Sequence, residues 1–192
     1  RDFTMSNTTS HTRLLCESAI MLALAVVLSQ IVFNQLPYGG ETTLVSMLPI
    51  LLIGLKNGPK WGFGTAFVYS LIQLAMSIVK VCGWGLSPLV FVVCILFDYL
   101  LPYTALGVSG FFGGKGRVMA MTGITLGIVL RFLCHFISGI TIWATWADGF
   151  SAVMNYSLTY NGAYMLPELI LTFIVSLILL QIPAIRRLLG LR

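Results

Sequence analysis

The chain has 192 residues, of which 58% are hydrophobic and only 9% are charged. Soluble domains carry about 25% charged residues, so this composition excludes a water-soluble globular protein and makes a lipid bilayer the expected surrounding. The net charge of +5 does not indicate nucleic-acid binding, because the basic residues are scattered at the ends of apolar segments and form no patch.

Six apolar runs follow one another along the chain and are predicted to form membrane helices. They cover about residues 14–33, 43–55, 61–79, 88–112, 118–143 and 156–182. The second run, at roughly 13 residues, is too short to cross the hydrocarbon core alone. Irregular backbone is tolerated at membrane depth only where protein or a cavity surrounds it, so we expect the preceding Gly39-Gly40 segment to enter the bundle.

Loop charges predict the orientation of these helices. Nine basic residues fall on one side of the predicted membrane, namely Arg1, Arg13, Lys56, Lys60, Lys115, Arg117, Arg186, Arg187 and Arg192. The loops on the other side carry only Lys80, together with the acids Glu41 and Asp148. The positive-inside rule then places both termini in the cytoplasm. The sequence therefore predicts an all-α integral membrane protein, a bundle of six transmembrane helices with both termini cytoplasmic.

The chain divides into three expected parts. Residues 1–12 form a polar N-terminal segment, and because the chain opens on Arg1 we expect the residues before Met5 to be an addition to the natural protein. Residues 13–185 are expected to form the six-helix transmembrane domain, which would hold any substrate. Residues 186–192 are expected to be a basic cytoplasmic tail.

One stretch of this largely apolar sequence is rich in ionisable and aromatic residues. It contains Arg131, His135, Trp143, Trp146, Asp148, Tyr156, Tyr160, Asn161 and Glu168. Ionisable groups inside apolar segments are costly, so they usually mark a ligand or ion site. Charged groups that alternate with amphipathic aromatic rings suit a pocket for a small, flat, polar or cationic molecule.

Helical rise indicates that these groups meet. At 1.5 Å per residue, His135 lies roughly 25 Å from the inner surface, and Asp98 and Glu168 lie near the midplane. Arg131 and His135 are four residues apart and share one helix face. The sequence therefore predicts a pocket in the outer half of the membrane, with Tyr38 and Glu41 on a loop above it.

Each of these residues also has a purely structural explanation. We expect Arg131 to pair with Asp98 or Glu168 rather than with a ligand. His135 could equally hold a neighbouring helix, and Glu41 could be a solvated loop acid. The tryptophans and tyrosines near the outer surface are also typical of an interfacial aromatic belt.

The sequence indicates no catalytic, metal or cofactor site. It contains no G-x-S-x-G or H-E-x-x-H motif, and its four cysteines lie singly without metal-ligand spacing. An intramembrane hydrolase built on Asp98 and His135 would lack a nucleophile. The chain also has no Walker motif and no two inverted halves, so active transport would need an energy source from a partner.

Several segments together resemble a known family. They are RFLCHFISGITIW at residues 131–143, YSLTYNG at residues 156–162, the pair Asp98-Tyr99, and the approach to the second run with Gly39-Gly40 and Met47-Leu48-Pro49. They resemble the thiamine-specific substrate-binding subunits, or S components, of energy-coupling factor (ECF) transporters. The resemblance extends over about residues 13–182.

The resemblance implies a function and its residues. A six-helix bundle in the bacterial plasma membrane would capture thiamine outside and dock onto a transmembrane coupling subunit that carries two ATPase subunits. Family positions map the pocket onto Asp98, Tyr99, His135, Trp143, Tyr156 and Asn161. The further candidates for substrate binding are Tyr38, Gly40, Glu41 and Glu168. Ala19 and Ala23, spaced as small-x-x-x-small, match the family motif that faces the coupling subunit.

Two departures from the family leave alternatives open. Some relatives have Glu where this chain has Asp98, and some carry Trp and Glu where this chain has Gly40 and Leu44. Glu41 is the candidate to replace the missing acid. The alternatives are an S component for another vitamin such as riboflavin, or, less favoured, an intramembrane enzyme or a self-sufficient carrier.

Overall fold

A computed structural model describes residues 3–144 and 147–191. Trp146 and the side chain of Tyr38 lie outside this described part. Within this described part, five helical stretches are long and apolar enough to cross a membrane: His11–Ser29 of α1 (Phe3–Ser29), α3 (Pro59–Gly83), Pro88–Phe112, Arg117–Trp143 and α7 (Phe150–Leu179). A sixth apolar helix, α2 (Leu48–Asn57), is shorter. The all-α membrane architecture is confirmed, whereas the number of crossings stays a prediction.

Two of the long stretches change helix type along their length. The first contains α4 (Pro88–Cys94), a π-helical turn η2 (Ile95–Leu100), α5 (Leu101–Thr104) and a 3₁₀ segment η3 (Ala105–Phe112). The second contains α6 (Arg117–Ser138) and a π-helical turn η4 (Gly139–Trp143). A short α8 (Pro183–Leu188) follows α7. π-Helical turns are rare and occur frequently at functional sites.

A small β-hairpin replaces the end of the first predicted helix. Strand β1 (Val32–Gln35) pairs antiparallel with β2 (Glu41–Thr43), and a 3₁₀ turn η1 (Pro37–Gly39) joins them. β-Branched and aromatic residues favour the strand, and Gly39 supplies the positive φ of 103° that the turn requires. The expected entry of the Gly39-Gly40 segment is confirmed at Gly40, which is buried.

Close backbone contacts hold the centre of the bundle together. A Cβ atom at Gly62 of α3 would lie 2.9 Å from the Cα of Gly54 in α2. One at Gly107 of η3 would lie 2.6 Å from the Cα of Phe63. A side chain at either position would collide with the neighbouring backbone, so glycine allows these helices to approach closely. Buried side chains of α2, such as Ile50 and Leu51, fill the remaining space.

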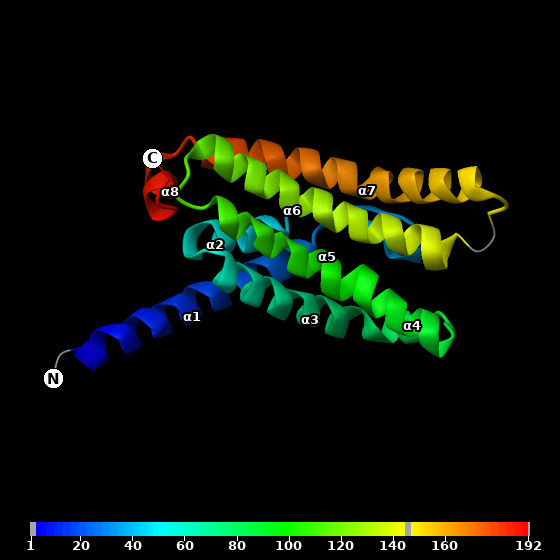
Figure 1. The fold of residues 1–192 in the computed structure, drawn as a ribbon, viewed down its shortest axis with the longest axis horizontal. Coiled ribbons are helices and arrows are strands. Elements are labelled where there is room, and N and C mark those ends of the chain that lie inside the picture. The colour runs from blue at the N-terminus through cyan, green and yellow to red at the C-terminus, as the bar shows by residue number, and fades with distance from the viewer. Residues whose placement is uncertain (1–2, 145–146, 192) are drawn as a thin grey trace.

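Both ends of the described chain lie at the same end of the bundle (Figure 1). The α2–α3 junction and the loop before α6, which carry lysines and an arginine, lie there too (Figure 1). This arrangement agrees with the orientation that the loop charges predict. α1 begins at Phe3, inside the segment expected to be a polar extension, and its first half projects away from the other helices (Figure 1).

The glycine contacts generate a stability prediction. We expect Gly107→Ala to destabilise the purified protein by about 1–3 kcal/mol, because the added methyl group collides with the backbone at Phe63. Gly64→Ala in α3 is the matched control, since nothing lies within 4 Å of its added Cβ. Thermal unfolding followed by tryptophan fluorescence measures both. Equal melting temperatures for the two variants would contradict the close packing.

Candidate functional site

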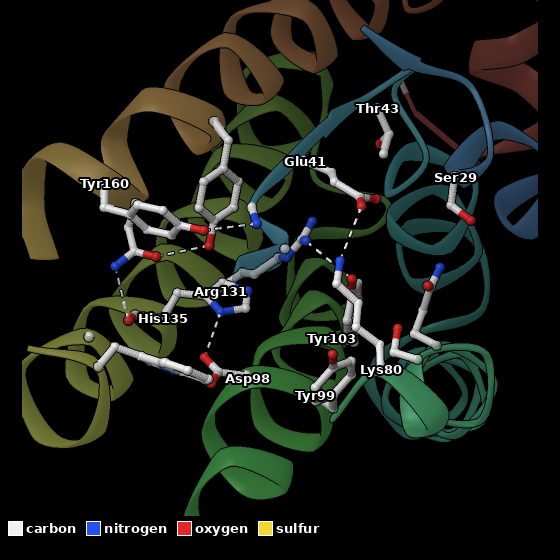
Figure 2. Close-up of a pocket in the computed structure, with 18 of the residues that line it drawn as sticks. Ser29, Glu41, Thr43, Lys80, Asp98, Tyr99, Tyr103, Arg131, His135 and Tyr160 are labelled. Carbon is white, nitrogen blue, oxygen red and sulfur yellow. Dashed lines mark hydrogen bonds and ion pairs between the residues drawn. The ribbon is translucent and has the colours of Figure 1, made fainter. Parts of the chain in front are cut away.

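A cavity of about 140 Å³ lies between the β-hairpin, α3, η2, α6, η4 and α7. Figure 2 shows polar and aromatic side chains from these elements converging on it. Eight of the ten predicted substrate-binding residues line it: Gly40, Glu41, Asp98, Tyr99, His135, Trp143, Tyr156 and Asn161. The fold therefore gathers residues that are more than 100 positions apart in the sequence.

The Asp98 carboxylate organises one wall of this cavity. Its Oδ1 lies 3.2 Å from His135 Nδ1, and its Oδ2 accepts hydrogen bonds from Ser138 Oγ at 2.7 Å and Trp143 Nε1 at 2.9 Å. The Asp98 side chain is only 16% exposed, so these charge-assisted bonds form away from bulk water. They fix the orientation of both rings.

A local backbone feature shapes η2, the turn that carries Asp98. Pro102 has no N–H, so the carbonyl of Asp98 lacks the partner that a regular helix would supply. The N–H of Leu101 bonds instead to Leu96 O, five residues earlier. The widened turn coincides with the segment that carries Asp98 and Tyr99.

His135 lines the cavity and has one ring nitrogen that the described protein groups leave unused. The side chain is buried, and its Nε2 has no hydrogen-bond partner among the described residues. When Nδ1 carries the proton toward Asp98, Nε2 is an acceptor. Buried polar atoms are normally paired, so this one indicates a place for a ligand atom.

Asn161 connects α6 to α7 as well as lining the cavity. Its Nδ2 donates to His135 O at 3.1 Å and to Ser157 O at 3.0 Å, while its Oδ1 accepts from Tyr164 Oη at 2.9 Å. The residue is 4% exposed. Its amide is therefore largely engaged by protein groups, and it holds His135 in place through the backbone.

The hairpin closes the cavity from above and is fastened to α7. Tyr160 Oη accepts from Gly40 N at 3.1 Å and donates to Pro37 O. Thr42 Oγ1 donates to Tyr164 O at 3.1 Å. On the α3 side the contact is weaker, since Lys80 Nζ lies 3.8 Å from Glu41 Oε1 and both side chains are partly exposed.

Glu168 lies behind the cavity wall instead of lining it. Its Oε2 accepts from the N–H of Thr43 and its Oε1 from Thr43 Oγ1, both at 2.7 Å. It is 1% exposed. Glu168 therefore does not line this cavity, and Thr43 bonds to both of its carboxylate oxygens; its contact with the ligand stays a prediction.

The expected ion pair of Arg131 is also absent. Among the described residues, no carboxylate lies within ion-pair distance of its guanidinium. Its Nη1 donates to Met47 Sδ at 2.8 Å, and its Nη2 donates to Tyr103 Oη at 3.3 Å. The prediction was wrong because Asp98 and Glu168 already have other partners.

Several cavity residues were missed from sequence. Lys80 and Trp84 come from the end of α3, and the ring of Trp84 packs edge-on against Trp143 at 5.0 Å. Tyr103 and Gln73 contribute further polar groups. The sequence did contain one signal that could have identified Lys80 as a site residue. It is the only basic residue in the loops on its side of the predicted membrane.

The two attachments of the hairpin generate a prediction. Glu168→Leu leaves the buried N–H of Thr43 unpaired, which costs about 1–3 kcal/mol, and we expect faster amide hydrogen exchange across residues 36–43. Lys80→Met removes only the partly exposed pair with Glu41, worth at most about 1 kcal/mol, and we expect little change. Faster exchange in Lys80→Met than in Glu168→Leu would contradict this ranking.

Comparisons with known proteins agree with the architecture. The family model described as thiamine transporter protein matches residues 15–186. The thiamine transporter ThiT of Bacillus subtilis strain 168 is 35% identical over 179 residues, which cover 86% of this chain and 88% of the relative. ThiT of Lacticaseibacillus paracasei strain ATCC 334 is 27% identical over 186 residues, with 86% of each chain covered.

A solved structure has the same fold. It is that of ThiT from Listeria monocytogenes, with a TM-score of 0.70, 22% sequence identity, and coverage of 94% of this chain and 98% of that one. The relatives carry the names of transport proteins, not of enzymes. With its five helices of membrane-spanning length, the chain is a multi-pass protein of the bacterial plasma membrane and belongs to the thiamine transporter protein family.

Proposed function

We propose that this chain is a high-affinity thiamine-binding S component of an ECF-type vitamin importer, which captures thiamine outside the cell. The observation that carries the proposal is the wall formed by Asp98, His135 and Trp143. It joins a partly buried carboxylate, a ring nitrogen without a hydrogen-bond partner among the described residues, and an aromatic face in one cavity. This is the chemistry that an amine-bearing, aromatic and cationic molecule requires.

The parts of thiamine match these groups. A carboxylate offers about four acceptor positions, and in the described part of the chain His135, Ser138 and Trp143 are at hydrogen-bond distance from the Asp98 oxygens. In this proposal a further position on Oδ1, which contacts His135 alone of these three, accepts from the exocyclic amine of the aminopyrimidine. His135 Nε2 accepts a second N–H. Trp143 and Tyr156 offer faces for stacking, or for a cation–π contact with the thiazolium worth about 0.5–2 kcal/mol.

The remaining predicted residues complete the site in this proposal. Tyr99 and Asn161 form its sides, and Gly40 and Glu41 belong to the hairpin that covers it. Glu41 adds a negative charge near the mouth, although it also accepts from Gln35 Nε2 at 2.8 Å. A closed hairpin slows dissociation, and a low off-rate is the usual source of high affinity.

Energy coupling is proposed to come from partners. The sequence has no Walker motif, and α1 presents an exposed face that includes Ala19 and Ala23. Large apolar side chains share this exposure, with Leu15 at 60% and Ile20 at 67%. Small residues at this spacing let another membrane helix approach closely, which suits a transmembrane coupling subunit that carries two ATPases.

Binding measurements on purified protein test the ligand. We expect nanomolar thiamine to quench tryptophan fluorescence, and Asp98→Asn to weaken binding at least about tenfold, because charge-assisted bonds to the pyrimidine and to Trp143 lose strength. Asp148→Asn, in an exposed loop, is the matched control and should bind normally. Tight binding of riboflavin without binding of thiamine would refute the ligand assignment and favour the alternative S component.

Uptake measurements test the coupling. We expect replacement of Ala19 and Ala23 by Trp to abolish thiamine uptake into cells while leaving binding by the purified protein intact. Ala152→Trp, on an exposed face of α7, should affect neither. Loss of binding in the double variant would show that this face of α1 is internal packing. Thiamine uptake into liposomes that contain this chain alone would favour a self-sufficient carrier.

A further inference from the structure

Lys80 brings a positive charge to the mouth of a cavity whose proposed ligand is itself a cation. It lies near the end of α3 and lines the cavity. Its Nζ is 3.8 Å from Glu41 Oε1, and Figure 2 shows the side chain reaching from α3 toward the hairpin. Like charges across an interface cost affinity, so Lys80 opposes the binding of a cation at this position.

Glu41 is the carboxylate for which the lysine and a cationic ligand would compete. The other cavity-lining carboxylate of the described part, Asp98, is already at hydrogen-bond distance from three groups of α6 and η4. Glu41 instead meets Lys80 and Gln35, whose Nε2 donates to Oε1 at 2.8 Å. With the aminopyrimidine held at Asp98, Glu41 is the cavity carboxylate that remains for the cationic ring.

The geometry lets the ammonium leave this position easily. At 3.8 Å the contact is an ion pair without a hydrogen bond, and exposed pairs of this kind are weak. The Lys80 side chain is 45% exposed, and its flexible four-carbon stem can carry the charge into water. The turn beside it has no side chain at Gly39, where an added Cβ would lie 3.2 Å from Nζ. The ammonium therefore rests against the turn without being enclosed by it.

We propose that the Lys80 ammonium is a built-in competitor, which pairs with Glu41 in the unliganded protein and is displaced by the cationic ring of the ligand. This inference rests on the proposed function. Displacement opposes every cationic ligand to the same extent, so cations that make few other contacts with the cavity are rejected, whereas thiamine keeps its bonds at Asp98. Repulsive elements of this kind are a general source of specificity. Lys80 is thus a specificity-determining residue, and its removal strengthens binding.

Titrations of purified variants with thiamine, followed by tryptophan quenching, test the sign of this effect. In about 10 mM salt we expect Lys80→Met to lower the Kd by about two- to fivefold, the gain that corresponds to one exposed ion pair. In about 1 M salt, where the Debye length is about 3 Å, the difference from wild type should disappear. Lys80→Arg keeps the charge and should bind like wild type. Lys115→Met removes an exposed lysine from the loop before α6, at the other end of the bundle, and should leave the Kd unchanged in both buffers.

A neutral ligand separates this role from an effect on the hairpin. In the analogue whose thiazolium nitrogen is replaced by carbon the ring carries no charge, so Lys80→Met should not lower its Kd. Unchanged or weaker thiamine binding by Lys80→Met overturns the inference. An equal gain for both ligands, or a gain that persists in 1 M salt, overturns it too, because Lys80 would then act regardless of charge. Failure of the wild-type protein to bind thiamine refutes the proposed function instead.

Discussion

The carboxylate of Asp98 is the interaction on which the geometry of the site depends. A buried charge without partners would be strongly destabilising, so its position is stable only where donors surround it. His135, Ser138 and Trp143 provide them from a single helical stretch. The same bonds join the fourth and fifth apolar runs and orient two rings toward the cavity. In the proposed function, the Asp98 carboxylate therefore serves both the structure of the site and the recognition of the ligand.

The β-hairpin above the cavity is held more strongly on its α7 side than on its α3 side. Toward α7 the hairpin makes hydrogen bonds to Tyr160, Tyr164 and Glu168, and the bonds to Tyr164 and Glu168 are buried. Toward α3 the ion pair that the described residues form is the partly exposed contact between Glu41 and Lys80. Buried bonds whose loss leaves an unpaired group are worth more than exposed ion pairs, so α7 anchors the hairpin. The α3 side is the weaker boundary.

The bundle also keeps the cavity apart from the exposed face of α1. The cavity lies among α3, α6, α7 and the π-helical turns, whereas α1, whose first half projects from the bundle (Figure 1), has exposed apolar side chains at Leu15, Ile20 and Leu24. The described residues place Ala19 and Ala23 on that outer face. Substitutions there and in the cavity are therefore expected to act independently, because Ala19 and Ala23 are exposed and are not among the described residues that line the cavity.

The sequence alone predicts that lipid surrounds the protein, where its helices lie, and most of the predicted residues that line the cavity. Apolar runs of membrane length predict helices because backbone groups in lipid must bond within their own segment, and ionisable residues such as Asp98 and His135 mark a cavity because lipid excludes them.

Only the tertiary structure decided which side chains pair with one another. Asp98 pairs with His135 instead of Arg131, Glu168 binds Thr43, and Lys80 faces Glu41. Val32 and Phe33 enter a strand instead of extending a helix, and that strand is completed only by pairing with β2. Such choices depend on which donor and acceptor meet at 3 Å across different segments, and hydropathy and spacing along one segment do not contain that distance.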